Sequence, residues 1–391
     1  MRDFISQRVK SIAPSGIRKF FDLASKRKDV ISLGVGEPDF VTPWEIRGAG
    51  INALKNGYTQ YTSNKGLQEL REEISRYLKE RFSVNFSADD TVITVGASEA
   101  IDITLRAVID QNDQVLIPDP SYVSYKPCVE LLGGQAISLP CSAQNGFKIT
   151  PEELERAITP KTKALIFPYP NNPTGAIMEK EEIEALIPII IKHDLLVISD
   201  EIYAELTFGK KHCSIASFPN LKDRVVLISG FSKAFAMTGW RIGYVCATNQ
   251  IISAILKIHQ YTAICAPIFS QYGALEGLKR GREDGYQTVI AMRDEYDRRR
   301  RFMLGAFRDM GVECFEPEGC FYIFPCVKNT GLTGEQFATK LLEQKNVAVV
   351  PGGAFGEFGV DFIRCSYAYS MQNLVSAMQK IAEFVKDLKT R

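Results

Sequence analysis

The chain has 391 residues, of which 45% are hydrophobic and 24% are charged, and its formal net charge is +1. This length exceeds one compact core, so a large domain and a smaller one are expected. The balanced charge argues against a nucleic acid or an anionic membrane surface as the partner.

The first ten residues are mixed and charged, without the apolar segment of a signal peptide, and no stretch approaches the ~20 apolar residues that span a bilayer. Nine cysteines are scattered without a C-x-x-C pair, which indicates reduced, mostly buried thiols and predicts a cytoplasmic location. Three unclustered histidines argue against a metal site and against a Ser-His-Asp triad.

The first half of the chain opens with a polar arm, a strand-like run at 30–33 and a turn-rich loop at 34–40. Two helices are predicted next, over 43–56 and 67–80. From about residue 90, β-rich runs alternate with helical stretches, which predicts an α/β domain with a mostly parallel seven-stranded sheet between helices. The predicted strands are 91–95, 114–117, 135–139, 164–167, 196–199, 225–229 and 242–246, and helices between them are predicted at 98–109, 151–157 and 180–192.

The second half predicts a smaller α+β domain. A helix over 251–278, broken near Pro267, is followed by a charged helix over 288–307, whose four arginines at 298–301 are interpreted as a solvated face. Short strands at 319–324, 347–350 and 362–366 and a last helix at 371–388 complete the chain. The predicted division is an arm with part of the small domain (1–45), the large domain (46–285) and the small C-terminal domain (286–391).

Lys233 lies in an apolar, glycine-punctuated run at 230–244, where a surface lysine is unusual. A desolvated lysine beside another cation loses its proton more easily, becomes a nucleophile and can form a Schiff base with an aldehyde. Ser232 and Arg241 are groups that suit a phosphate. An aldehyde, a phosphate and a lysine together suggest pyridoxal phosphate, although an isolated lysine after a strand is more often simply solvated.

Other strand ends carry residues that suit the same cofactor, because ligands of parallel sheets bind at the carboxyl ends of the strands. Asp200 ends a buried run and would pair with a protonated pyridine nitrogen, unless it only caps a strand. Tyr203 and Asn172, the latter in a proline-rich loop at 168–175, could donate to the ring oxygen, or belong to an ordinary strand end and turn.

Three further features complete the candidate site. Ala97 and Ser98 begin a helix whose free N–H groups could hold a phosphate, although Ser98 could instead be a simple N-cap. An aromatic ring after the strand at 114–117, Tyr122 or Tyr125, could stack on the pyridine ring or pack in the core. Arg364 lies in an apolar strand and needs an anion, either a substrate carboxylate or a structural partner.

These residues resemble the class I/II pyridoxal-phosphate-dependent aminotransferases of fold type I along nearly the whole chain. The motifs that carry the resemblance are GVGEPDF at 34–40, YTSNKG at 61–66, GAS at 96–98, NNPTG at 171–175, SDEIY at 199–203, and the run from Ser232-Lys233 to Arg241-Ile-Gly. The chain looks closest to the bacterial and archaeal branch with a PSGIRKF arm, here at 14–20.

The resemblance implies a homodimer of a transferase of amino-acid metabolism that moves an amino group from an L-amino acid to a 2-oxo acid, 2-oxoglutarate or pyruvate. The reaction would be ping-pong through pyridoxamine phosphate, with Lys233 as Schiff-base lysine and proton shuttle, and with Asp200 and Tyr203 also catalytic. By resemblance, the cofactor phosphate would be held by Ala97, Ser98, Ser232 and Arg241, and by Tyr61 of the neighbouring subunit. The pyridine ring would stack on Tyr122, and its ring oxygen would be contacted by Asn172 and Tyr203. The α-carboxylate of the substrate would be bound by Gly36, Asn172 and Arg364.

Two departures concern specificity. No arginine for a distal substrate carboxylate can be placed, and Tyr125 stands where the aspartate-specific branch has a histidine beside the aspartate. The alternative reactions are β-elimination from a cysteine conjugate by a C–S lyase of the same fold, and a ligand-sensing regulator. A regulator is expected to carry a DNA-binding domain and a basic patch, which this sequence does not show. The amino donor and the residues that read its side chain stay open, because they depend on the arm near Ile17 and on the partner subunit.

Overall fold

The computed structural model describes residues 2–14, 16 and 29–389. Within them, the central sheet has seven strands in the order β2-β8-β7-β6-β5-β3-β4, and only β8 runs antiparallel to its neighbours. The prediction of a mostly parallel seven-stranded sheet is therefore confirmed. The strands are β2 Thr91–Thr94, β3 Gln114–Asp119, β4 Gln135–Pro140, β5 Thr162–Phe167, β6 Leu196–Asp200, β7 Val225–Gly230 and β8 Gly243–Cys246.

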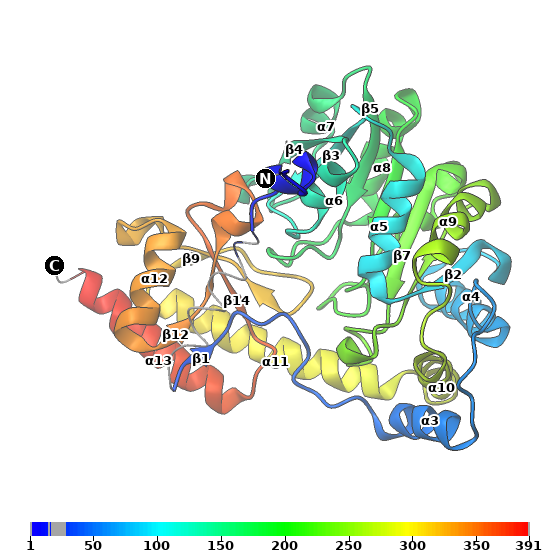
Figure 1. Cartoon of the computed structure of the whole chain (residues 1–391). Helices are drawn as coiled ribbons and strands as arrows, with labels where there is room; N and C mark the ends of the chain where they lie inside the picture. Colours follow the sequence, from blue (N-terminus) through cyan, green and yellow to red (C-terminus); the bar gives the residue numbers. More distant parts are fainter. Residues whose placement is uncertain (1, 15, 17–28, 390–391) are drawn as a thin grey trace.

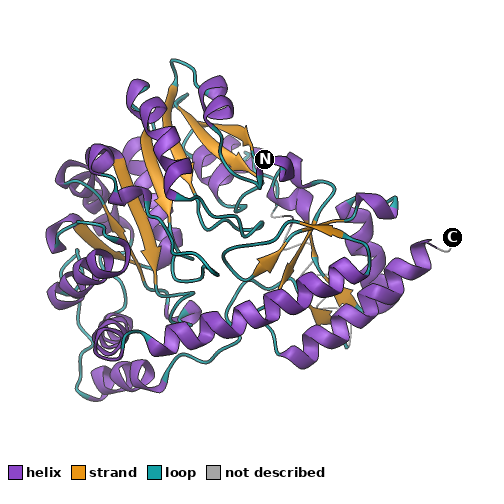
Figure 2. Ribbon diagram, turned by 180° about the vertical axis from the view of Figure 1, so that it is seen from behind, coloured by secondary structure: helices purple, strands orange, loops and turns teal. Residues whose placement is uncertain are grey.

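Helices cover both faces of this sheet, because the strands are apolar on both sides (Figures 1 and 2). Alternate residues of β5 show the division: Leu165 packs toward α8, whereas Ala164 and Ile166 pack toward α5 and α9. The helices around the sheet are α5 Gly96–Val108, α6 Tyr125–Leu131, α7 Pro151–Ala157, α8 Lys180–Lys192 and α9 Asn249–Thr262.

A third layer lies at the β2 edge of the sheet. Helices α3 (Trp44–Lys55), α4 (Gln68–Phe82) and α10 (Ile268–Asp284) share an apolar cluster with side chains of β7 and β8. The long helix α11 (Gln287–Asp309) then runs from beside α10 to the C-terminal part of the chain (Figure 2).

The C-terminal part forms its own apolar core around α11, α12 (Gly334–Lys345) and α13 (Met371–Lys389). Its strands are short, so the sequence patterns there predicted more strand than exists. They are β9 Glu313–Cys314, β10 Tyr322–Ile323, β11 Pro325–Cys326, β12 Val347–Ala348, β13 Val350–Pro351 and β14 Ile363–Ser366, and β12 pairs with β1 (Ile31–Ser32). The domain boundaries at residues 45 and 285 stay a prediction.

One interpretation was wrong: the arginines at 298–301 are not a uniformly solvated face. Arg299 is 5% exposed and donates to Asp39 and Glu295, both at 2.8 Å. Arg300 is also buried, and Arg298 and Arg301 are exposed. A run of like charges hides this difference, because successive helix residues point to different sides.

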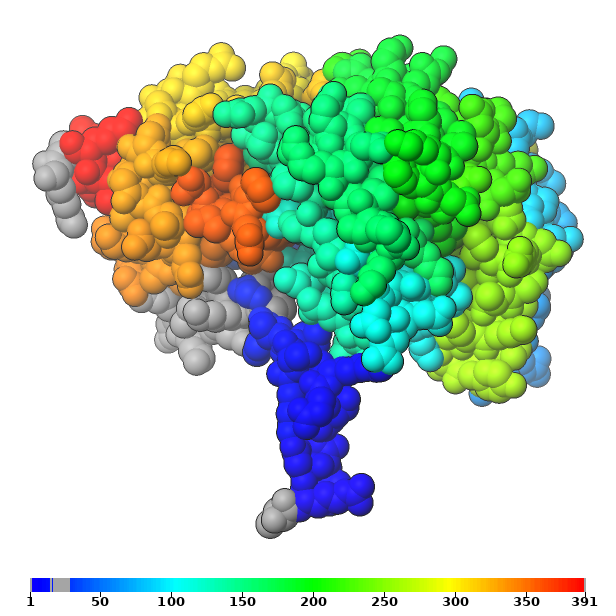
Figure 3. All heavy atoms as spheres, turned by 90° about the horizontal axis from the view of Figure 1, so that it is seen from above, coloured from blue at the N-terminus to red at the C-terminus, as the bar shows by residue number. Residues whose placement is uncertain are grey.

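The described N-terminal residues extend from the body of the molecule, and include α1 (Gln7–Ser11) (Figure 3). Ile17 and most of the PSGIRKF arm lie outside the described residues. Of the helices that the structure describes, none combines the length and apolarity of a membrane span. All nine cysteines are free thiols, four of them buried and five partly buried.

Candidate active site

A cavity of about 790 Å³ opens at the carboxyl ends of the parallel strands. Lys233 follows β7, Asp200 ends β6, Asn172 follows β5 and Tyr122 follows β3. Arg241 precedes the antiparallel β8, which brings it to the same edge. The cavity is lined by eleven of the predicted site residues: Gly36, Ala97, Ser98, Tyr122, Asn172, Asp200, Tyr203, Ser232, Lys233, Arg241 and Arg364.

Tyr61 is the predicted site residue that does not line this cavity. Its side chain is 77% exposed on the loop between α3 and α4. This position is compatible with a contact to a second subunit, and the role of Tyr61 there stays a prediction.

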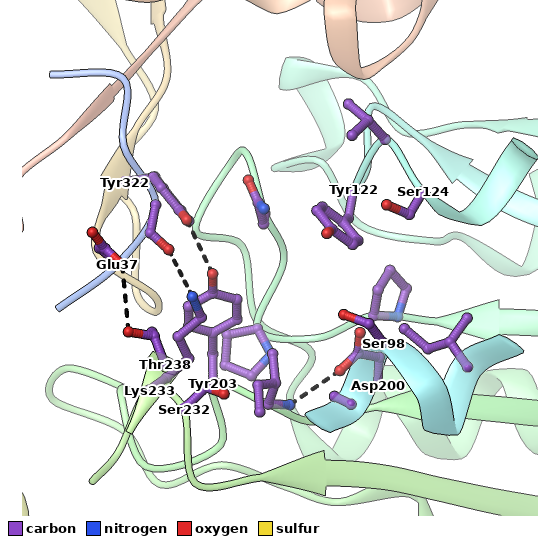
Figure 4. A pocket seen from close by; sticks show the side chains of 18 of the residues that line it. Glu37, Ser98, Tyr122, Ser124, Asp200, Tyr203, Ser232, Lys233, Thr238 and Tyr322 are labelled. Carbon is purple, nitrogen blue, oxygen red and sulfur yellow. Dashed lines mark hydrogen bonds between the residues drawn. The ribbon is translucent and has the colours of Figure 1, made fainter. Parts of the chain in front are cut away.

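Lys233 projects into the cavity (Figure 4), where its Nζ donates to the carbonyl oxygen of Gly36 at 2.6 Å. The rings of Tyr203 and Phe321 lie near the same nitrogen, with centroids at 5.7 and 5.5 Å. Burial, together with the positive charge of Arg364, lowers the pKa of Lys233 to about 8. A neutral amine, the form that acts as nucleophile and base, is therefore accessible at moderately alkaline pH.

Asp200 accepts hydrogen bonds from the Tyr125 hydroxyl at 2.7 Å and from the Ile202 backbone at 3.2 Å. Burial nevertheless raises the pKa of Asp200 to about 6, because these neutral donors only partly offset the desolvation of the carboxylate. A cationic group of a ligand at this carboxylate would offset the rest of the desolvation cost.

Tyr125 lines the cavity and donates its hydroxyl to Asp200, which is the supporting contact expected of the residue at this position. It is buried, its hydroxyl lies on Asp200, and its ring is nearly perpendicular to that of Tyr122, with the two centroids 5.5 Å apart. Tyr122 points into the cavity (Figure 4) and remains the candidate for stacking.

Arg364 on β14 is 3% exposed and donates to Asn172 Oδ1 at 2.8 Å and to the Gly34 carbonyl at 2.6 Å. Its Nε has no hydrogen-bond partner, and within the described residues its guanidinium contacts neutral acceptors and no carboxylate. The structural ion pair that competed with a substrate role is therefore absent from the described part of the chain. A buried guanidinium held by neutral acceptors is poised to bind an anion.

The opposite end of the cavity suits a second anion. Helix α5 begins there without a side-chain cap, and Ser98 is exposed rather than capping. The N–H groups in the first turn of a helix have no partner within the helix, and the positive end of the helix dipole favours an anion there. Arg241 Nη1 donates to the Thr238 carbonyl at 3.0 Å. A Cβ at Gly96 would lie 2.7 Å from Arg241 Nη2, so glycine is needed for the guanidinium to approach this helix end.

Tyr322, on β10, lines the cavity and was missed by the sequence reasoning. Its hydroxyl lies 3.0 Å from the Tyr203 hydroxyl, and the Arg364 guanidinium lies 4.2 Å from its ring centroid. The run at 319–324 is apolar and aromatic throughout, so no sequence signal distinguished Tyr322 from its neighbours.

The donor set as a whole fits pyridoxal phosphate. An anion site at the start of α5, a carboxylate for a cationic ring nitrogen and a neutralisable lysine occupy one cavity. The unpartnered Nε of Arg364 leaves a further anion site beside the lysine. Across the described residues, no group of three or more His, Cys, Asp or Glu side chains could hold a metal ion.

Comparison with known proteins agrees with this geometry. The family model "Aminotransferase class I and II" matches residues 28–381. A putative aminotransferase of Bacillus subtilis is 50% identical, covering 98% of this chain and 99% of that protein. The solved aspartate aminotransferase from Thermus thermophilus with maleate superimposes with a TM-score of 0.93 at 34% identity, covering 98% and 100% of the two chains. The solved aromatic aminotransferase from Pyrococcus horikoshii gives 0.90 at 40% identity, with 96% and 100% covered.

The family match spans nearly the whole chain, and the relatives are similar in length and in fold. The site also supplies the groups that the cofactor of these enzymes requires. The chain therefore belongs to the class I and II aminotransferases, which are pyridoxal-phosphate-dependent transferases of fold type I.

Proposed function

We propose that this enzyme moves an amino group from an L-amino acid to 2-oxoglutarate or pyruvate, in a ping-pong cycle in which the two substrates use the same cavity in turn. The observation that carries the proposal is that Lys233 and Arg364 face one cavity and that neither pairs with a carboxylate in the described part of the chain. The pair provides a base and a carboxylate-binding group for each substrate.

Pyridoxal phosphate would be held at both ends. The first turn of α5 at Ala97 and Ser98, with Ser232 and Arg241, would hold the phosphate. Asp200 would keep the ring nitrogen protonated, Asn172 and Tyr203 would donate to the ring oxygen, and Tyr122 would stack on the ring. When bound, the cofactor supplies an aldehyde that takes up the amino group and a ring that withdraws electrons from the substrate α-carbon.

Arg364 would bind the α-carboxylate of either substrate through its guanidinium edge, helped by the Asn172 amide and by close approach to Gly36. This contact orients the α-hydrogen toward Lys233. The Lys233 Nζ would remove the α-proton and redeliver it to the cofactor carbon C4′, and reverse these transfers with the 2-oxo acid. The lowered pKa of Lys233 favours the neutral amine for the first transfer.

We further propose that the enzyme acts as a homodimer with shared active sites, to which Tyr61 of each subunit contributes. Large apolar side chains lie exposed on and beside α3, and along the chain from the end of α9 to the start of α10. Helix α3 packs against α10, and Asn64, in the loop that carries Tyr61, donates to the Ile264 carbonyl at 3.0 Å. A protein of this size rarely leaves such side chains uncovered in one region. They are Val41, Trp44, Ile51, Leu54, Tyr58, Tyr61, Tyr261, Ile264 and Phe269.

The variant Lys233→Ala tests the catalytic assignment. It should bind pyridoxal phosphate, because the phosphate and ring-nitrogen contacts remain, but lose multiple turnover. Lys126→Ala, which removes an exposed lysine from α6, is the matched control and should keep full activity. Multiple turnover by Lys233→Ala would contradict the assignment.

Acceptor dependence separates transamination from the β-lyase alternative, which no feature of the cavity favours. A lyase would release pyruvate and ammonia from a cysteine conjugate without any 2-oxo acid. An aminotransferase would need the 2-oxo acid for more than one turnover.

A further inference from the structure

The Tyr203–Tyr322 pair is a feature that the proposed reaction does not yet use. Tyr322 is 1% exposed, and the two hydroxyl oxygens lie 3.0 Å apart (Figure 4). Either hydroxyl could be the donor in the protein alone. Which hydroxyl donates is decided if Tyr203 donates its proton to the ring oxygen of the cofactor.

Packing leaves the Tyr322 hydroxyl little freedom to move away from Tyr203. The guanidinium of Arg364 lies over its ring at 4.2 Å, and the Phe321 ring centroid lies 4.8 Å from its own. A Cβ on Gly36 would collide with the Tyr322 hydroxyl, so this glycine makes the room in which the hydroxyl lies. The ring is therefore clamped between the carboxylate-binding arginine and the core.

A tyrosine hydroxyl has one proton to donate and two lone pairs that accept. If Tyr203 donates its proton to the ring oxygen of the cofactor, it has none left for Tyr322 and must accept there. Tyr322 must then donate, which fixes a chain that runs from Tyr322 to Tyr203 and on to the cofactor. Hydrogen bonds in such a chain strengthen one another in a buried environment.

We propose that Tyr322 is a positioning residue whose hydroxyl donates to Tyr203, and so holds and strengthens Tyr203 as the donor to the cofactor's ring oxygen. The inference rests on the proposed function, in which Tyr203 contacts that oxygen. Because Tyr322 also lies against Arg364, it links the group that binds the substrate carboxylate to the group that tunes the cofactor.

The test is a pH titration of the visible absorption of the cofactor-loaded enzyme. A negative ring oxygen raises the pKa of the nearby lysine-derived nitrogen, and a hydrogen bond to that oxygen counteracts this effect. Tyr203→Phe should therefore raise the titration pKa. Tyr322→Phe should also raise this pKa, but by a smaller amount, roughly 0.3 to 1 pH unit, because it weakens the hydrogen bond from Tyr203 without removing it.

The double variant decides whether the two hydroxyls form one chain. Tyr203→Phe with Tyr322→Phe should titrate like Tyr203→Phe alone, because Tyr322 has nothing left to strengthen. Gly36→Ala, which keeps both hydroxyls but displaces that of Tyr322, should reproduce the shift of Tyr322→Phe. Tyr367→Phe is the matched control: its hydroxyl is buried outside the cavity, 3.4 Å from the Cys320 carbonyl, and its loss should leave the titration unchanged.

An unchanged titration in Tyr322→Phe, or full additivity with Tyr203→Phe, would overturn the role of Tyr322 and leave the proposed function standing. Absence of any lysine-dependent visible band in the wild-type enzyme would instead overturn the proposed function. If Tyr322→Phe changes thermal stability but not the titration, its role is structural and the inference is wrong.

Discussion

Arg364→Leu removes the guanidinium proposed to hold the substrate carboxylate. Within the described part of the chain, this arginine donates to Asn172 and to the Gly34 carbonyl, and its loss leaves no buried carboxylate there without a partner. Leucine can cover the Tyr322 ring that the guanidinium now covers. The free energy of unfolding should therefore change by only about 1–2 kcal/mol, the cost of weakening two hydrogen bonds.

Catalysis should suffer far more. Truncating one partner of a buried, hydrogen-bonded charge pair costs about 2–5 kcal/mol, which corresponds to a loss in kcat/KM of roughly 30-fold to several thousand-fold. The assay is the amino-acid half-reaction, followed by cofactor absorbance. The same assay with the corresponding amine, which lacks the carboxylate, should show little difference between the variant and the wild type.

A matched control is Arg298→Leu, which removes an exposed arginine from α11 and should leave the half-reaction unchanged. If Arg364→Leu keeps kcat/KM within threefold of the wild type, Arg364 does not bind the carboxylate. An equal loss with the amine and the amino acid would point instead to a general distortion of the cavity.

Three further predictions follow from the charges in and near the site. Without cofactor, burial raises the pKa of Asp200 from 3.8 to about 6, so the native state binds the extra proton and the wild type loses stability as pH rises through that range. In denaturant unfolding, Asp200→Asn should be more stable than the wild type by up to ~3 kcal/mol at pH 7.5, and the difference should vanish below about pH 3. The rate of pyridoxal phosphate binding should level off above pH 8, because the pKa of Lys233 is about 8. A rate that still rises tenfold per pH unit beyond pH 9 would indicate a lysine whose pKa is not lowered. Arg299→Met should destabilise the protein by about 2–3 kcal/mol through loss of the charged hydrogen bonds to Asp39 and Glu295, whereas Arg298→Met should change stability by less than ~0.5 kcal/mol.

The sheet could be predicted from sequence because its buried strands are short β-rich runs, and helix signals separate several of them. Helices α7 and α8 were predicted with the observed bounds, 151–157 and 180–192. The C-terminal part was predicted less well. Helix α12 (Gly334–Lys345) was missed, and the strand expected over 319–324 shortens to Tyr322–Ile323. Aromatic runs such as this one occur both in β-strands and in irregular segments of a packed core, so the hydrophobic period of the sequence does not distinguish a strand from such a segment.

That most candidate residues would meet in one cavity could be predicted, because they follow strand ends and the topology of a parallel sheet brings strand ends together. Their roles toward a cofactor or a substrate stay predictions. What could not be predicted is how side chains are paired. Tyr125 was expected either to stack on the ring or to lie beside the aspartate, and only the structure shows its hydroxyl on Asp200. Tyr322 had no sequence signal. Arg299 and Arg298 are neighbours in sequence, yet only the fold shows that one is buried against Asp39. The cytoplasmic location, the dimer and the role of Tyr61 stay predictions.

The most direct test of the central claim is the absorption spectrum of the purified enzyme loaded with pyridoxal phosphate, recorded before and after single amino acids are added without a 2-oxo acid. The trial set should include aspartate and aromatic amino acids, because relatives carry both names. We expect at least one amino acid to convert the lysine-linked band to that of pyridoxamine phosphate, and 2-oxoglutarate or pyruvate to restore it. A band that survives every amino acid, with pyruvate released from a cysteine conjugate, would contradict transamination, and a protein that shows no such band with added cofactor would contradict the whole account.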